Sequence, residues 1–119
     1  MPGEKEDAAY LWDMLDAARS VVEFAAGMRY AEYLGDRKTQ VAVEREVEII
    51  GEAARKVSRE FQDAHGEIPW KKIVAQRHAL AHEYGEIRQD IMWVVVTVHV
   101  PELIQAIERL IPPSPEPGN

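Results

Sequence analysis

Apolar side chains recur every three or four positions along most of the chain, which is the period of an α-helix with one buried face. The pattern predicts one long helix over about residues 6–28 and another over about 38–64. The first stripe consists of Leu11, Met14, Ala18, Val21, Ala25 and Met28. The second consists of Val43, Val47, Ile50, Ala54, Val57 and Phe61. Residues 29–36 contain two tyrosines before a Gly-Asp break and are expected to form a short helical turn and loop.

Proline marks where the later helices begin or bend. Pro69 precedes Trp70 at the expected start of a third helix, where its missing N–H does no harm. A fourth helix is expected from about Gln89, and Pro101 must either kink it or open a fresh helix that ends near Ile111. The β-branched run at 94–98 has no second strand to pair with, so it is expected to be buried helix. The predicted fold class is therefore all-α, an up-and-down bundle of four main helices.

Length and composition fit one cytoplasmic domain. The 119 residues predict a single helical domain over 1–111 and a disordered proline-rich tail over 112–119. The absence of cysteine excludes disulfides and thiolate metal sites and fits a reducing compartment. We find no 18-residue apolar run and no secretion signal, so no membrane partner is expected. The net charge of −7 argues against a broad basic face of the kind that grips nucleic acid, and no DNA partner is expected.

The expected third helix carries the candidate chemistry in the stretch Arg-His-Ala-Leu-Ala-His-Glu-Tyr, residues 77–84. Arg77 and Tyr84 fall on its apolar stripe, where leucine would be the neutral choice, and a buried charge needs a partner or a task. His82 lies five residues after Arg77, only about 7.5 Å further along the helix axis. His78 is four residues before His82, on the same face.

These residue types suit work on a phosphodiester. A histidine titrates near neutral pH, an arginine keeps its charge, and a tyrosine hydroxyl can orient a ligand. The segment from Trp70 to Arg88 is also the only locally basic one. The spacing alone is more typical of an ordinary bundle helix, whose arginine pairs with a buried glutamate and whose histidine caps a carbonyl. Glu52 could face Arg77, and Gly51 beside it would suit a close approach of neighbouring backbone.

The order of these features resembles the HepT-type toxins of the HEPN ribonuclease superfamily. The similarity extends over residues 43–111 and includes Ile-Ile-Gly-Glu-Ala-Ala at 49–54, Glu-Ile-Pro-Trp at 67–70, the Arg77–Tyr84 motif and the segment 93–103 with its proline. The spacing of Arg, four residues, His, one residue, Tyr is weak alone, but the upstream motifs make the match specific.

The resemblance implies a HEPN-type bundle that dimerises through the motif region and acts as a metal-independent RNA endonuclease. Arg77 and His82 would be the catalytic pair, with no cofactor. His82 would take part in proton transfer as a 2′-hydroxyl attacks the adjacent phosphate, while Arg77 would hold that phosphate and a cyclic phosphate would form. The expected assembly is a homodimer, with a larger hetero-oligomer left open.

The resemblance also implies a partner. The family forms the toxin half of a type VII toxin–antitoxin pair with a minimal nucleotidyltransferase of the MntA type, which transfers AMP to the motif tyrosine, here Tyr84. A bulky anionic adduct in a groove built for RNA phosphate would block substrate by both volume and charge.

One departure and one alternative concern His78. The family often has Asn after the motif Arg, so His78 would be a supporting residue that substitutes for Asn, alters the pH profile or weakens activity. His78 and His82 also have the i, i+4 spacing of two zinc ligands. The sequence lacks the glutamate of a His-Glu-x-x-His motif and leaves only His65, His99 or carboxylates as further ligands, so no metal site is predicted.

Two functional classes remain open. The first is an RNA-cleaving toxin, favoured by the intact Arg77, His82 and Tyr84. The second is a noncatalytic HEPN binding module that engages a nucleotidyltransferase partner, favoured by the acidic net charge, because phosphate binding usually comes with a basic footprint.

Overall fold

All regular secondary structure in the described part of the chain is helical. The computed structural model describes residues 4–82 and 87–111, and the side chains of residues 4–5 and 77–82 lie outside that description. Its elements are α1 (Glu4–Phe24), α2 (Tyr30–Leu34), α3 (Arg37–Lys56), α4 (Arg59–Ala64), α5 (Trp70–His82), α6 (Gln89–Val94), the π-helical turn η1 (Val95–His99) and α7 (Val100–Glu108). The predicted tail over 112–119 lies outside the described residues.

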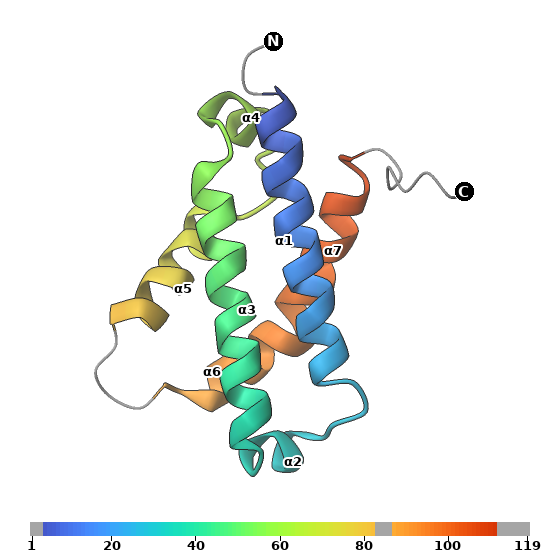
Figure 1. The fold of residues 1–119 in the computed structure, drawn as a ribbon, viewed down its shortest axis with the longest axis vertical. Helices are drawn as coiled ribbons and strands as arrows, with labels where there is room; N and C mark the ends of the chain where they lie inside the picture. Colours follow the sequence, from blue (N-terminus) through green and yellow to red (C-terminus); the bar gives the residue numbers. More distant parts are fainter. Residues whose placement is uncertain (1–3, 83–86, 112–119) are drawn as a thin grey trace.

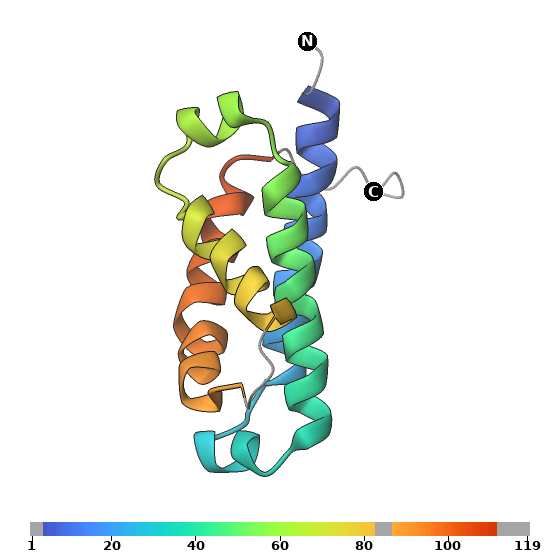
Figure 2. The same ribbon diagram turned by 90° about the vertical axis from the view of Figure 1, so that its left-hand side faces the viewer.

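Four main helices make up the bundle, which confirms the predicted fold class. The antiparallel helices α1 and α3 pack along their length, and the continuous helix formed by α6, η1 and α7 covers them from behind (Figure 1). We call this continuous helix the fourth helix. Helix α5 packs chiefly on α3 and crosses the bundle obliquely, as the side view shows (Figure 2). Its C-terminal end projects outward from the bundle (Figure 1).

The core consists of the predicted stripes of the two long helices together with one face of the fourth helix. Met14, Val21 and Val43 are completely buried. Every member of the two predicted stripes is buried except Met28 and Phe61, which are half-buried. Burying such side chains contributes about 1.5–3 kcal/mol each, so these stripes are the main source of stability.

The first helix differs from its prediction at both ends. It begins at Glu4, two residues before the predicted start, and its Asp7 is buried. It ends at Phe24 and not near residue 28, because Gly27 adopts a left-handed φ of 76° that no helix continues through.

The prediction of one helix over 38–64 was wrong. Val57 has an extended conformation, with φ −64° and ψ 138°, and the chain restarts as α4. Ser58 caps α4, because its side chain accepts a hydrogen bond from the Phe61 N–H. Asp7 of α1 stabilises this break: its carboxylate accepts hydrogen bonds from the Ser58 N–H at 2.8 Å and from the Ser58 hydroxyl at 2.7 Å.

Replacing Asp7 by alanine should therefore destabilise the fold. The change leaves the Ser58 N–H and hydroxyl without their acceptor, so we expect the free energy of unfolding to fall by about 2 kcal/mol. Asp16→Ala on the exposed face of the same helix is the matched control and should change little. Urea denaturation of both variants measures the difference. Equal stability losses would show that the Asp7–Ser58 contact contributes nothing.

Pro101 neither breaks the fourth helix nor starts a fresh one. The turn before it widens into the π-helical segment η1, in which the Val100 N–H donates to the Val95 carbonyl. A wider turn gives room to the proline ring, which would otherwise meet the carbonyl four residues earlier. The Thr97 hydroxyl donates to the Trp93 carbonyl at 2.8 Å within this region.

The fourth helix is only partly buried, which corrects a second prediction. Val95 and Val96 lie in the core, but Val94 and Val98, expected to be buried with them, are about half exposed. From Gln89 to Glu108 the helix is long and apolar enough to cross a membrane by length and composition alone, although a core helix of a soluble protein passes the same test. One face of it packs on α1 in the bundle.

Candidate active site

The helix that carries the motif is fixed at its start. The indole N–H of Trp70 donates to the His65 carbonyl at 3.0 Å, and the Trp70 ring meets Phe61 edge-on with centroids 6.2 Å apart. Ile68, just before Pro69, is 2% exposed. The predicted start of the third helix at Ile-Pro-Trp is confirmed, and these contacts set the direction in which α5 leaves the loop.

The predicted catalytic residues occupy the last two turns of α5. Arg77, His78 and His82 all belong to this helix, which ends at His82. Their helical backbone confirms the expected rise of about 7.5 Å between Arg77 and His82. Tyr84 lies outside the described residues, as do the three side chains. Their roles therefore stay predictions.

The apolar stripe of α5 that leads to Arg77 faces α3. Trp70 is buried and Ile73 and Val74 are half-buried, which confirms this stripe up to residue 76. On the α3 side, Gly51 is buried. The close backbone approach expected at Gly51 stays a prediction.

Glu52 of α3 takes part in a charged cluster. Its carboxylate accepts a hydrogen bond from Arg55 at 2.8 Å and lies 3.6 Å from the Lys56 ammonium. The hydrogen bond that Arg55 donates to Glu52 raises the pKa of Arg55. Whether Glu52 also faces Arg77 stays a prediction, because the Arg77 side chain lies outside the description.

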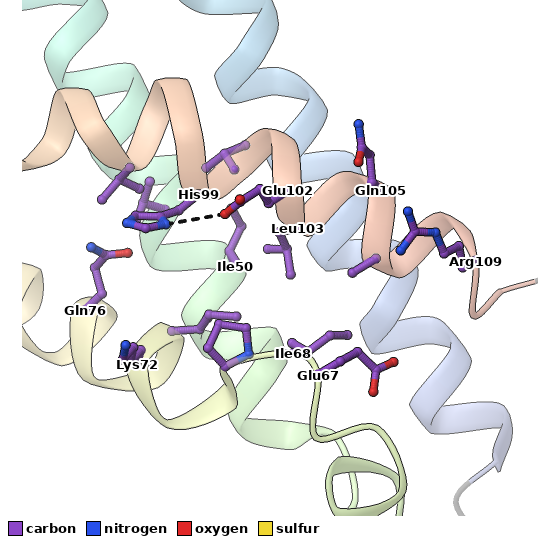
Figure 3. Close-up of a pocket in the computed structure, with 16 residues that line it drawn as sticks. Ile50, Glu67, Ile68, Lys72, Gln76, His99, Glu102, Leu103, Gln105 and Arg109 are labelled. Carbon is purple, nitrogen blue, oxygen red and sulfur yellow. Dashed lines mark ion pairs between the residues drawn. The ribbon is translucent and has the colours of Figure 1, made fainter.

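A groove of about 650 Å³ runs along the flank of α5 just before the motif. Its floor is apolar and includes Ile50, Ile68 and Leu103, from α3, the α4–α5 loop and α7 (Figure 3). Polar groups stand along its edges, among them Lys72 and Gln76 of α5. Gln76 immediately precedes Arg77, so the helix that lines one edge of the groove is the helix that carries the candidate catalytic residues.

The opposite edge of the groove contributes residues that the sequence did not reveal as neighbours of α5. His99 and Glu102 line it, with the imidazole Nδ1 and the carboxylate 3.8 Å apart (Figure 3). Arg109 lies at the far end. No sequence signal relates these residues to Lys72, since the groove forms only when α3, α5 and α7 pack together.

A buried polar cluster fixes the start of the fourth helix, where the chain returns from the motif. The Gln89 side-chain N–H donates to Glu44 of α3 at 2.8 Å, and Glu44 is 9% exposed. Tyr33 lies nearby with its ring 5.1 Å from that of Trp93. Burial, with a smaller contribution from the Glu44 charge, raises the pKa of Tyr33 to about 12 and keeps its hydroxyl neutral.

The two histidines considered as further zinc ligands have carboxylate neighbours. His65 Nδ1 lies 3.6 Å from Glu67, and His99 lies beside Glu102. Among the side chains that the structure describes, no three His, Cys, Asp or Glu residues gather as metal ligands would. His78 and His82 lie outside that set, so the expectation of no metal site stays a prediction.

Known proteins are similar to this sequence over most of its length. The profile of the family described as "Ribonuclease HepT-like" matches residues 14–110. A Methanocaldococcus jannaschii protein with the provisional name RNase MJ0127 is 36% identical over 108 residues, which are 91% of this chain and 89% of the relative. "Probable ribonuclease HepT" of Thermococcus cleftensis is 36% identical over 101 residues, 85% of this chain and 92% of the relative. No solved structure matches the chain.

Proposed function

Because the chain belongs to the HepT-like ribonuclease family, we propose that it is an RNA endonuclease in which Arg77 and His82 cleave the phosphodiester. The observation that carries this proposal is the placement of both residues on the last two turns of one helix, whose earlier turns line a groove and whose end projects from the bundle (Figure 1). Lys72 and Gln76 offer further polar contacts for RNA along the groove.

The proposed reaction uses the neighbouring 2′-hydroxyl of the RNA as its nucleophile. His82 takes part in proton transfer as the 2′ oxygen bonds to phosphorus, the bond to the 5′ oxygen breaks, and that oxygen takes up a proton. Arg77 holds the phosphate and neutralises the charge that grows on it. The products are a 2′,3′-cyclic phosphate and a 5′-hydroxyl. Side chains supply both proton transfer and charge neutralisation, so the reaction requires no metal.

His78 is a supporting residue in this proposal. It stands beside Arg77 where the family often has asparagine, and it lies one turn before His82 on the same face of α5. A second imidazole there adds a group that titrates near neutral pH, and its protonation would oppose protonation of His82.

Two copies of the motif helix are proposed to form one site. The C-terminal end of α5 projects from the bundle, which leaves it open on the outer side to a second copy (Figure 1). A homodimer brings two Arg77–His82 pairs to one cleft and so supplies twice the positive charge that a single acidic chain provides.

The proposed regulation is AMP transfer to Tyr84 by an MntA-type nucleotidyltransferase, as in a type VII toxin–antitoxin pair in the cytoplasm. Tyr84 follows His82 by two residues in the chain. This proximity supports the proposal, because a nucleotide added there adds bulk and negative charge beside the catalytic pair.

The acidic net charge of −7 supports a second candidate function, a noncatalytic module that binds the nucleotidyltransferase. Such a protein would present Tyr84 for modification without cutting RNA. RNA digestion by purified protein separates the two functions.

The same RNA digestion, run with and without a chelator, also tests whether cleavage requires a metal. We expect purified protein to cleave single-stranded RNA at the same rate with and without excess EDTA, because no step requires a metal. Gel analysis of the RNA over time measures the rate. Loss of cleavage in EDTA with recovery on adding Zn²⁺ would instead assign His78 and His82 to a metal site. RNA that stays intact under all conditions would favour the binding module.

A further inference from the structure

The fourth helix presents apolar side chains that the bundle leaves uncovered. Over an 18-residue window its mean hydropathy is 1.4, yet only 33% of that window is buried. Ile91, Val94 and Val98 are 49%, 44% and 45% exposed, although the core side of the same helix is filled by Met92, Val95 and Val96. We call these three exposed residues the outer stripe. Their spacing of three and four residues places them along one line of the helix, as in the seam of a helix pair.

The outer stripe lies in a part of the chain that carries no carboxylate, lysine or arginine. Residues 91–101 are the longest such stretch in the sequence. Among the other exposed apolar residues, Val22 and Phe24 stand beside Glu23, and Tyr30 stands beside Arg29. Two copies of a chain with net charge −7 repel one another, so an uncharged face is the one on which they can approach at least electrostatic cost.

We infer that the outer stripe is the face through which two copies of this chain associate, with their fourth helices packed antiparallel. This inference deepens the proposed function, on which it rests, by naming the surface through which the two copies of the proposed dimer associate. A two-fold axis midway between Val94 and Val95 sets Ile91 of one copy against Val98 of the other and leaves Val94 one residue, about 1.5 Å along the helix axis, from its own counterpart.

Charge at the ends of the stripe selects the antiparallel arrangement. In that register Arg88 of one copy lies opposite Pro101 of the other, one residue from Glu102, and the side chains of Arg88 and Glu102 are about 70% exposed. A parallel pair would instead set Glu102 against Glu102. Within its own chain, the Arg88 guanidinium lies 2.7 Å from the Asp90 carboxylate. This hydrogen bond lowers the pKa of Asp90 and keeps it ionised beside the arginine. The guanidinium carries enough donors to serve both carboxylates.

A lipid surface would also cover an apolar stripe, but the observations favour a second copy. Asp90 and Glu102 bracket the stripe on the same helix, and its opposite face is packed on α1. A helix that entered the acyl region would carry those charges with it, and interfacial helices typically have lysine and arginine on the polar face.

Sedimentation velocity of the full chain tests the surface. Wild type should sediment as a dimer, and Val94→Asp should be monomeric with unchanged helical content, because residue 94 is exposed in the single copy. Val41→Asp on α3 is the matched control, since Val41 is 48% exposed, and it should remain a dimer. A Val94→Asp protein that stays dimeric overturns the inference. So does a monomeric wild type that cosediments with phosphatidylcholine vesicles, which would assign the stripe to lipid.

Cysteine cross-linking tests the register, because the natural chain contains no cysteine. Val94→Cys should form a disulfide with its own copy on mild oxidation, as helices 8–10 Å apart bring facing positions within disulfide reach. The Ile91→Cys protein alone and the Val98→Cys protein alone should form no disulfide between copies. A mixture of the two proteins should cross-link. Self-linking at all three positions would mean a parallel pair and would overturn the antiparallel register. Both assays are independent of RNA, so a dimer of this form that cleaves nothing would refute only the proposed function.

Discussion

RNA cleavage by the His82→Ala protein is expected to be slower than that of wild type by about 10²–10⁴-fold, the usual contribution of a positioned acid–base group. Arg77→Ala should lose a similar factor, because the phosphate charge that grows in the transition state would have no guanidinium beside it. Helical content should stay close to that of wild type in both variants, since alanine has the highest helix propensity. Initial rates on a defined RNA, with circular dichroism on the same preparations, measure both effects.

Matched controls come from the α4 region, away from the end of α5. Arg59→Ala removes an arginine whose side chain is 83% exposed, and His65→Ala removes a histidine that packs on Phe61. Neither should change the cleavage rate. Full activity of purified His82→Ala would remove His82 from the mechanism and leave the protein as a binding module.

Tyr84→Phe is expected to keep its nuclease activity and to escape neutralisation by the nucleotidyltransferase. Phenylalanine retains the ring but lacks the oxygen that would accept AMP. After incubation with an MntA-type enzyme and ATP, intact-mass measurement should show AMP on wild type and none on Tyr84→Phe. RNA cleavage should then be lost in wild type alone.

Tyr30→Phe is the matched control for this experiment, because Tyr30 is 39% exposed on α2 and its hydroxyl lies outside the motif. It should be modified and neutralised as wild type is. Equal AMP addition to wild type and Tyr84→Phe would place the acceptor elsewhere. A modified wild type that still cleaves RNA would separate the modification from neutralisation.

Helical periodicity predicted the bundle because its two longest helices are strongly amphipathic. Met14 and Val43, assigned to the core from spacing alone, are completely buried. The break at Ser58 was missed, because the apolar stripe continues through Val57 to Phe61 and hides the change of direction. The contact that stabilises the break joins Asp7 to Ser58, 51 residues apart, and no local pattern indicates such a pair.

The fourth helix shows a different limit of sequence patterns. From Ile91 to Val98 nearly every residue is apolar, so the pattern has no polar face that would distinguish the buried side from the exposed one. The prediction that Val94 and Val98 are buried failed for this reason. Burial of Val96 and exposure of Val98 depend on where α1 packs, which is a tertiary property.

The sequence predicted the helix that carries the candidate site, but it did not predict which residues of other helices lie around that helix. Pro69 and the apolar stripe indicated where α5 begins and which side of it faces the core. The groove beside it combines α5 with residues of α3 and α7, so His99 and Glu102 had no visible relation to Lys72 in the sequence. The pairing of Glu44 with Gln89, which fixes the chain after the motif, was missed for the same reason.

The most direct test of the account is the chemistry of the RNA ends that the purified wild-type protein produces. A short RNA of defined sequence is incubated with stoichiometric protein in EDTA, and the fragments are identified by mass spectrometry. The proposed reaction predicts fragments that end in a 2′,3′-cyclic phosphate, matched by fragments that begin with a 5′-hydroxyl. Intact RNA, or fragments that carry a 5′-phosphate, would contradict it.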